Sequence, residues 1–129
     1  MIEITINQEL MDLNNYINAE RSNRFKASKI KKEQTAIVAF ECKKLINQGL
    51  KIDQKDMPLD FEFHWFMKNK RKDKDNIVFA KKFIFDGMIA SGLLENDGWK
   101  EIGSFIDVVS VDKDNPRVEV KIKTLKEIE

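Results

Sequence analysis

Residues 59–67 read LDFEFHWFM, and this stretch decides the fold class because two kinds of side chain alternate along it. The apolar positions are Phe61, Phe63, Trp65 and Met67, and the polar positions are Asp60, Glu62 and His64. Successive side chains of an extended chain point to opposite faces, so this pattern is typical of a strand with one face in the core. We therefore predict a half-buried strand at residues 59–67.

Further strands are predicted on both sides of this segment. Residues 2–6 alternate isoleucine with polar side chains, which favours a short strand. Residues 102–111 and 117–124 also read as strands, and only the polar turn 112–116 separates them. Such a short connection predicts that these two strands pair with each other as an antiparallel hairpin.

Three helices are predicted between the strands. A short helix runs towards Glu20, and a second occupies about residues 33–48, where Gly49 marks its end. A third extends from residue 76 to about residue 91, with Asp75 at its N-cap. Helices mixed with strands in this order predict an α+β fold, a small single domain over residues 1–129 with helices packed on a mixed or antiparallel sheet.

The composition agrees with one folded domain and limits its location. Hydrophobic residues make up 42% of the 129, enough for a core. The single cysteine, Cys42, excludes an intramolecular disulfide, and one cysteine with one histidine removes the usual zinc sites. No apolar run approaches ~18 residues, which predicts a cytoplasmic protein with no membrane partner.

The charges are distributed unevenly, although the net charge is only +1. Residues 1–72 carry 14 basic and 10 acidic side chains, whereas residues 73–129 carry 9 and 12. Residues 21–32 hold six cations and no acid. A local basic face acts over about one Debye length, ~8 Å in physiological salt, so it can bind a polyanion despite the neutral total.

The segment KNKRKDKDN at residues 68–76 places two carboxylates, Asp73 and Asp75, within a run of cations. A third carboxylate, Asp97, lies in an Asn-Asp-Gly turn beyond the third helix. Oxygen ligands of this kind suit Mg²⁺, with Mn²⁺ as a substitute. We predict that the three aspartates meet if the strand after the turn runs back beside the strand that precedes Asp73. The same pattern also fits a solvated loop in which Asp75 only caps a helix.

A catalytic lysine is predicted on the third helix. Lys82 follows Asp75 by seven residues, which is two helical turns, so the two side chains point in nearly the same direction. Lys81 is rotated by about a third of a turn from that direction. We expect both lysines to be exposed, and Lys82 to be the one that approaches a phosphate bound near Asp75.

The two basic runs predict a surface for the phosphate backbone of DNA. A single charge run is usually ordinary solvated surface, but two runs beside an acidic cluster favour a DNA-binding groove. The candidate DNA-binding residues are Arg24, Lys26, Lys29, Lys31, Lys32, Lys68, Lys70, Arg71, Lys72 and Lys81. We expect His64, Cys42 and Trp99 to have structural or packing roles.

Residues 68–102 resemble the RusA-type Holliday junction resolvases, a family of crossover junction endodeoxyribonucleases common in phages and prophages. The segments that carry the resemblance are Asp73-Lys74-Asp75-Asn76, Lys82-Phe83-Ile84-Phe85-Asp86 and Leu94-Glu95-Asn96-Asp97. A looser likeness covers residues 13–24, which are rich in asparagine, and the strands at 102–124 fit the family's terminal strands.

The resemblance implies a homodimer that cleaves four-way DNA junctions with Mg²⁺ in recombination or repair. It implies that Asp73, Asp75 and Asp97 bind the metal and that Lys82 or Lys81 is the essential lysine. Two alternatives remain open from the sequence. One is a DNA-binding module without catalysis, such as a phage regulatory protein, and the other is a protein-interaction domain whose charges serve only solvation.

Overall fold

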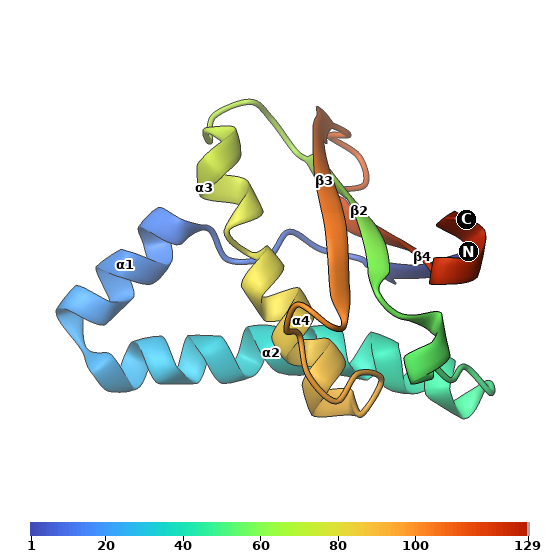
Figure 1. Ribbon diagram of the computed structural model, residues 1–129. Helices are drawn as coiled ribbons and strands as arrows, with labels where there is room; N and C mark the ends of the chain where they lie inside the picture. The colour runs from blue at the N-terminus through green and yellow to red at the C-terminus, as the bar shows by residue number, and fades with distance from the viewer. Residues whose placement is uncertain (129) are drawn as a thin grey trace.

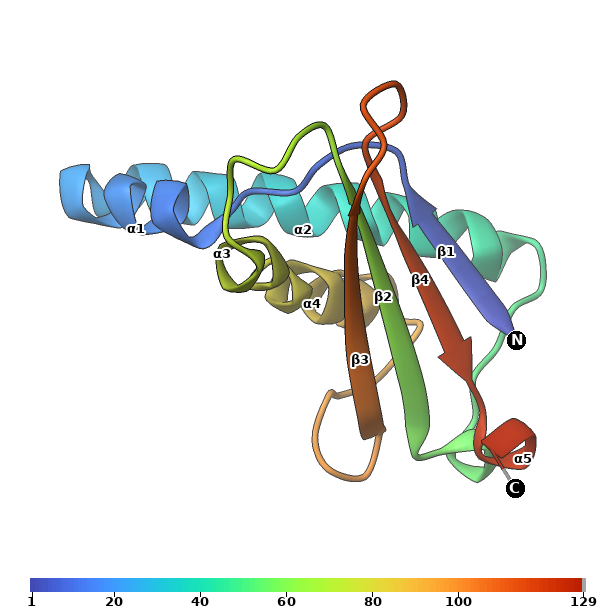
Figure 2. The same ribbon diagram turned by 90° about the horizontal axis from the view of Figure 1, so that it is seen from above.

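The computed structural model describes residues 1–128 and contains one four-stranded sheet, shown from above in Figure 2. Its strands are β1 (Ile2–Ile6), β2 (Leu59–Met67), β3 (Ile102–Val111) and β4 (Arg117–Lys123). They lie in the order β1-β4-β2-β3. The β1–β4 and β4–β2 pairs are antiparallel and the β2–β3 pair is parallel, so the sheet is mixed and the α+β prediction is confirmed.

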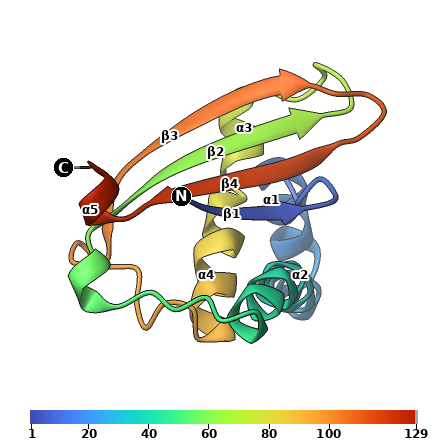
Figure 3. The same cartoon turned by 90° about the vertical axis from the view of Figure 1, so that its right-hand side faces the viewer.

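Four helices lie on one side of this sheet (Figures 1 and 3). They are α1 (Leu13–Ser22), α2 (Arg24–Asn47), α3 (Lys74–Val78) and α4 (Lys81–Ser91). A 3₁₀ turn, η1 (Gln54–Asp56), precedes β2, and a short helix, α5 (Leu125–Ile128), follows β4. Within residues 1–128, no helix covers the opposite face of the sheet.

The alternating segment at residues 59–67 forms a strand with one buried face, as predicted, and this strand lies between β4 and β3. Phe61, Phe63 and Trp65 are almost completely buried on the helix side, where they belong to one apolar cluster with Phe83 and Ile84 of α4. Burial of each large apolar side chain stabilises the fold by about 1.5–3 kcal/mol. This cluster holds α4 against β2 and thereby fixes the segment between them, which contains Asp73 and Asp75.

Helices α2 and α4 cross closely at Gly87. A Cβ atom at this position would lie 2.5 Å from Cβ of Val38, so only glycine fits here. The helix ends predicted at Gly49 and at about residue 91 are confirmed, because Gly49 and Gly92 adopt the positive φ angles that glycine favours.

The predicted hairpin of residues 102–124 is wrong. Strand β2 lies between β3 and β4, so Trp65 is paired with Val109 on one side and with Val118 on the other. The turn at 112–116 therefore spans the end of β2. The strand order β4-β2-β3 follows from the pairing of β2 on both of its edges. The local sequence of β3 and β4 contains no signal that another strand lies between them.

Two predicted helices also have different bounds. The second begins at Arg24 rather than near residue 33, because Asn23 ends α1 and its side chain accepts a hydrogen bond from the backbone N–H of Phe25. The third is divided into α3 and α4 at Phe79–Ala80. The residue at the N-cap of α3 is Asp73, and Asp75 lies in the first helical turn, so the predicted cap at Asp75 is wrong.

Candidate metal and nucleic-acid site

Asp73 and Asp75 lie at the junction between β2 and α3 and are both exposed. One carboxylate oxygen of Asp75 accepts a hydrogen bond from the backbone N–H of Asn76 at 3.0 Å. Asp73 lines a cavity of about 440 Å³ between this junction and the last residues of β3, Val109–Val111. Within residues 1–128 neither carboxylate takes part in an ion pair.

Several cations surround these two carboxylates without neutralising them. Lys68, Lys70, Arg71 and Lys74 are exposed and make no ion pair with any residue of the described chain. Lys70 and Lys74 line the same cavity as Asp73. The segment 68–76, which we call the acidic–basic loop, therefore presents free negative and free positive charges together.

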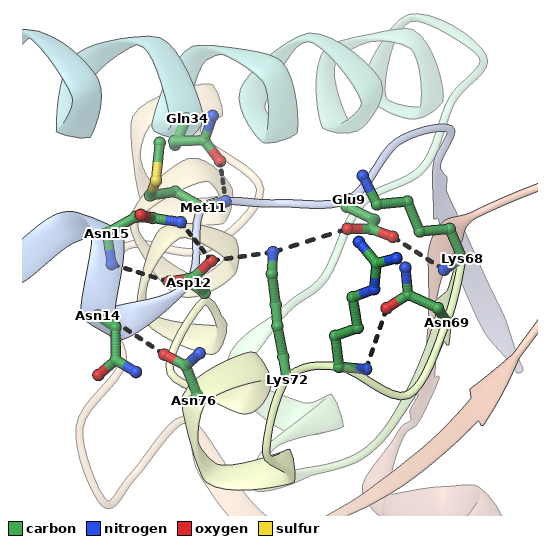
Figure 4. Close-up of polar contacts among 11 residues, drawn as sticks. Glu9, Met11, Asp12, Asn14, Asn15, Gln34, Lys68, Asn69, Lys72 and Asn76 are labelled. Carbon is green, nitrogen blue, oxygen red and sulfur yellow. Dashed lines mark hydrogen bonds and ion pairs between the residues drawn. The ribbon is translucent and has the colours of Figure 1, made fainter.

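The acidic–basic loop is fastened to the segment that precedes α1, as Figure 4 shows. Nζ of Lys72 lies 2.9 Å from Oδ2 of Asp12 and 3.8 Å from Oε1 of Glu9. The backbone N–H of Lys68 donates to Oε2 of Glu9 at 2.9 Å. Since Lys72 is engaged within the protein, we exclude it from the DNA-binding surface that the sequence predicted.

A second contact joins the far end of the loop to the start of α1. The backbone N–H of Asn14 donates to Oδ1 of Asn76 at 2.8 Å. The residue after the second aspartate therefore contacts the start of α1, and the loop is linked to the α1 region at both of its ends.

Asp12 is the central residue of this connection and is only 3% exposed. It is also the N-cap of α1, where its carboxylate accepts two hydrogen bonds from Asn15. Burial alone would raise the pKa of the Asp12 carboxyl, but the hydrogen bonds from Asn15 and Lys72 outweigh it and lower this pKa below its usual value. Asp12 is not among the site residues that the sequence predicted. The signal that was available is an aspartate directly before a helical pattern, which is a common N-cap.

Helix α1 and residues 24–33 of α2 form a projection that we call the basic arm. Figure 1 shows that it extends beyond the sheet. Its six cations are all exposed: Arg21, Arg24, Lys26, Lys29, Lys31 and Lys32. Lys29 approaches Glu33 at 3.9 Å across an exposed helix turn, which is a weak interaction, and the other five make no ion pair within residues 1–128. The basic run is therefore helical and carries a high density of positive charge.

Asp97 does not join Asp73 and Asp75 within one chain, so the predicted trio is wrong as a single-chain site. The carbonyl of Glu101 accepts a hydrogen bond from the backbone N–H of Leu59, which ties the turn of Asp97 to the start of β2. Asp73 follows the end of β2. Because β3 runs parallel to β2, the turn and the acidic–basic loop lie at opposite ends of strands about 30 Å long.

The two candidate lysines occupy different environments, and the expectation that both are exposed is wrong. The side chain of Lys81 is 14% exposed, and its Nζ lies 2.6 Å from Oδ2 of Asp107 on β3. It also lies over the ring of Phe105, 4.1 Å from the centroid. Lys82 is exposed, and its nearest carboxylate is Asp86 at 4.0 Å. The break between α3 and α4 also removes the continuous helix on which the alignment of Lys82 with Asp75 depended.

The acidic–basic loop offers two exposed carboxylates, Asp73 and Asp75, as possible metal ligands. Across the described part of the chain, no three His, Cys, Asp or Glu side chains are grouped closely enough to hold a metal ion together. Mg²⁺ needs fewer protein ligands, since it retains several waters and is often held by one or two carboxylates and a substrate phosphate. Asp73 and Asp75 fit that smaller requirement.

The sequence predicted structural or packing roles for Cys42, His64 and Trp99. Cys42 is buried, and burial raises the pKa of its thiol to about 11, in agreement with a core role. His64 is half-buried on the open face of the sheet, 3.6 Å from Glu62. The packing role expected for Trp99 is wrong, because its side chain is 99% exposed beside Asp97.

No protein-family model and no curated protein sequence matches this chain. Within residues 1–128, none of the helices combines the length and the apolar character that a membrane crossing needs. The functional assignment therefore depends on the geometry of the acidic–basic loop and the basic arm.

Proposed function

We propose that this protein is a Mg²⁺-dependent endodeoxyribonuclease that acts in the cytoplasm on branched DNA, with four-way junctions as the preferred substrate. The observation that carries the proposal is the pair of free carboxylates, Asp73 and Asp75, among cations that are also free. Free charges of both signs suit a site where carboxylates hold a cation while lysine and arginine hold phosphates.

The connection between the acidic–basic loop and the basic arm supports the same proposal. Lys72 and Asn76 fasten the loop to the start of α1, so DNA held along the arm has a fixed position relative to Asp73 and Asp75. Fixed positioning is a main source of rate in reactions at a phosphodiester, because it places the attacking water and the phosphate in line before reaction. The resemblance of residues 68–102 to the RusA-type resolvases favours a junction over linear duplex.

The protein groups have separate roles in the proposed reaction. Asp73 and Asp75 hold the metal through carboxylate oxygens, and the bound metal supplies a water of lowered pKa and a Lewis acid at the phosphate. Lys82 is the candidate that stabilises charge on the reacting phosphate, because its amine is exposed whereas that of Lys81 is paired with Asp107. Lys68, Lys70 and Arg71 bind neighbouring phosphates.

The test is to incubate the protein with an end-labelled synthetic four-way junction. The matched substrate is a linear duplex that contains one labelled strand of the junction and its full complement. We expect metal-dependent cleavage of the junction near its centre, none in EDTA, and slower cleavage of the duplex. No cleavage of any DNA with Mg²⁺ or Mn²⁺ would reject the enzymatic proposal.

A DNA-binding module without catalysis is the second candidate, and the basic arm favours it because the arm alone accounts for DNA affinity. The two candidates differ in their response to the metal. A binding module holds DNA equally well with Mg²⁺ and with EDTA. The nuclease should hold DNA more tightly with Mg²⁺, because a cation between a phosphate and the carboxylates of Asp73 and Asp75 reduces the repulsion between them.

A further inference from the structure

The cavity beside the acidic–basic loop has an apolar lining that is open to solvent. Its volume is about 440 Å³, and its apolar lining comes from Met67, Ile77, Val109 and Val111. Met67 and Ile77 are almost fully buried, whereas Val111 is 44% exposed at the end of β3. A cavity of this size, with apolar walls and a few polar groups, is typical of a site for a small organic group.

Polar groups in the same lining suit the parts of a nucleotide. Lys70 and Lys74 are exposed cations, and Asp73 is one of the two proposed metal ligands. The side-chain oxygen of Asn69 accepts a hydrogen bond from the backbone N–H of Arg71 at 3.0 Å, which leaves its amide nitrogen to donate. Cations for a phosphate, a donor for a base edge and an apolar surface for the plane of a base therefore line one cavity.

Other classes of ligand match only part of this lining. Inorganic phosphate needs the cations but not the apolar surface. An apolar side chain of a partner protein needs the surface but not the cations or the carboxylate beside it. A nucleotide uses all of these groups, because it joins an anionic phosphate to a planar base with apolar faces.

From this lining we propose that the cavity binds one unstacked nucleobase of the DNA, at a nucleotide that flanks the branch point. The proposal deepens the proposed function and rests on it, because it names the part of the substrate that the site recognises. A base and its own phosphate are joined by a single sugar. A base in the cavity therefore holds that phosphate near Asp73, which positions it for reaction.

The cost of unstacking a base gives the site a preference for branched DNA. A base inside a duplex is paired and stacked on both sides, so its removal from the stack is unfavourable. At a branch point the regular stacking is interrupted, and a base leaves its stack at a lower cost. Burial of the base against the apolar lining offsets that cost. The basic arm contacts the phosphates of either substrate, so the cavity is the part of the protein that distinguishes them.

Two valines of β3 allow a matched comparison. Val111 lines the cavity, and Val108, which is 42% exposed, lies on the opposite face of the strand. The faces differ because Val111 is paired with the buried Met67 of β2, whereas Val108 is paired with His64 on the open face of the sheet. The same substitution at the two positions therefore changes the cavity in only one variant.

The fluorescence of aminopurine, an adenine analogue that is quenched in a base stack, measures whether a base is unstacked. No aromatic ring is among the residues described in the lining of the cavity, so a base held there should stay unquenched. The analogue is placed in turn at each nucleotide that flanks the branch point, and binding is measured in EDTA so that no strand is cut. We expect a rise in fluorescence at one of these positions when the wild type binds.

The two valine variants should differ in this assay. Val111→Trp should abolish the rise, because its indole fills the cavity, whereas Val108→Trp should retain it. The affinity of Val111→Trp for the junction should also fall by about tenfold, and its affinity for linear duplex should not change. No rise at any position with the wild type at saturation, or equal rises with both variants, would overturn the proposal.

Protection of an introduced thiol tests the same contact with smaller substitutions, and it decides the matter if circular dichroism shows that Val111→Trp does not fold. The thiol of Val111→Cys should react with a maleimide in the free protein and lose that reactivity when the junction is bound. The thiol of Val108→Cys should react equally in both states. The wild type is the blank, because its Cys42 is buried. Equal reactivity of Val111→Cys with and without the junction would also count against the proposal.

The nucleobase site and the proposed function fail in distinguishable ways. If the wild type cuts the junction with Mg²⁺ but no aminopurine position responds, the nucleobase site is wrong and the nuclease stands. If one position responds but no DNA is cut with Mg²⁺ or Mn²⁺, the enzymatic proposal is wrong and the nucleobase site stands. If the wild type binds no DNA, both are wrong.

Discussion

Nζ of Lys72 lies 2.9 Å from Oδ2 of Asp12, and this ion pair fastens the acidic–basic loop to the base of the basic arm. The carboxylate of Asp12 is almost fully buried and also caps α1. One residue therefore contributes to helix stability, to loop position and to the relation between two proposed DNA contacts.

Removal of the Asp12 carboxylate should destabilise the fold. We expect Asp12→Ala to lower the free energy of unfolding by about 2 kcal/mol, because it removes a cap and leaves Lys72 without its nearest partner. Asp12→Asn keeps a capping oxygen, so it should lose less. Urea denaturation followed by circular dichroism measures both, and an Asp12→Ala variant as stable as Asp12→Asn would contradict the capping role.

The contribution of the Asp12 charge should depend on pH. The pKa of Asp12 is lower in the folded protein than its usual value of 3.8, so ionisation is linked to folding. The stabilisation is fully present above that value and is lost as the pH falls through the lower folded-state pKa. The difference in unfolding free energy between the wild type and Asp12→Asn should therefore be constant near neutrality and shrink in acid. A difference in unfolding free energy that grew on acidification would contradict a lowered pKa of Asp12 in the folded protein.

Asp75→Asn should abolish DNA cleavage and preserve or improve junction binding, since it removes a proposed metal ligand and one negative charge near the phosphate. Stability should change little, because asparagine can still accept the hydrogen bond from the backbone N–H of Asn76. Glu3→Gln, on exposed surface of β1 outside the basic arm, makes the same change in charge and serves as the control. Cleavage by Asp75→Asn within a few-fold of wild type would reject the metal assignment.

Loss of charge on the basic arm should weaken binding to all DNA and reduce its dependence on salt. Each lost phosphate contact lowers the slope of log affinity against log salt by about 0.9, so Lys29, Lys31 and Lys32 changed together to glutamine should lower it by up to about 2.7. The control changes Lys43, Lys55 and Lys126, which are exposed elsewhere. Equal slopes for the two triple variants would identify the arm as ordinary solvated surface.

Lys81 and Lys82 should separate in stability and in activity. Lys81→Ala should cost about 1–2 kcal/mol of unfolding free energy, because it removes the partner of Asp107 and the cation over Phe105. Lys82→Ala should cost less than about 0.5 kcal/mol. Single-turnover cleavage should instead fall by about 100-fold in Lys82→Ala and only modestly in folded Lys81→Ala. The reverse order in activity would move the catalytic role to Lys81.

The sequence predicted those elements whose pattern is complete within a short window. Strand β2 alternates over nine residues, and the glycines after α2 and α4 mark the helix ends. The early start of α2 was missed because the basic run lacks apolar periodicity and Asn23 alone provides the cap. The break before α4 was missed because it contains neither glycine nor proline. There Phe79 packs on the ring of Tyr16 in α1, which is a contact between distant segments, and on the nearby ring of Phe83.

The candidate site was predictable in composition but not in arrangement. Spacing alone identified Asp73 and Asp75 in a cationic setting, and both are exposed at the junction between β2 and α3. The position of Asp97 depended on whether β3 runs parallel or antiparallel to β2, and local sequence carries no signal for that choice. Asp107 was missed because a single carboxylate in an apolar strand resembles solvent-facing surface, whereas its oxygens bind Lys81 and the indole N–H of Trp65.

The thin packing of the basic arm has a consequence for its local stability. Its fully buried side chains are Ala19 and Ala27, so little apolar area holds α1 against α2. Segments with few buried apolar contacts open at a free-energy cost below that of global unfolding. Backbone amides of the arm should therefore exchange with deuterium sooner than those of β2, and bound DNA should slow that exchange by ordering the arm before the rest of the molecule responds.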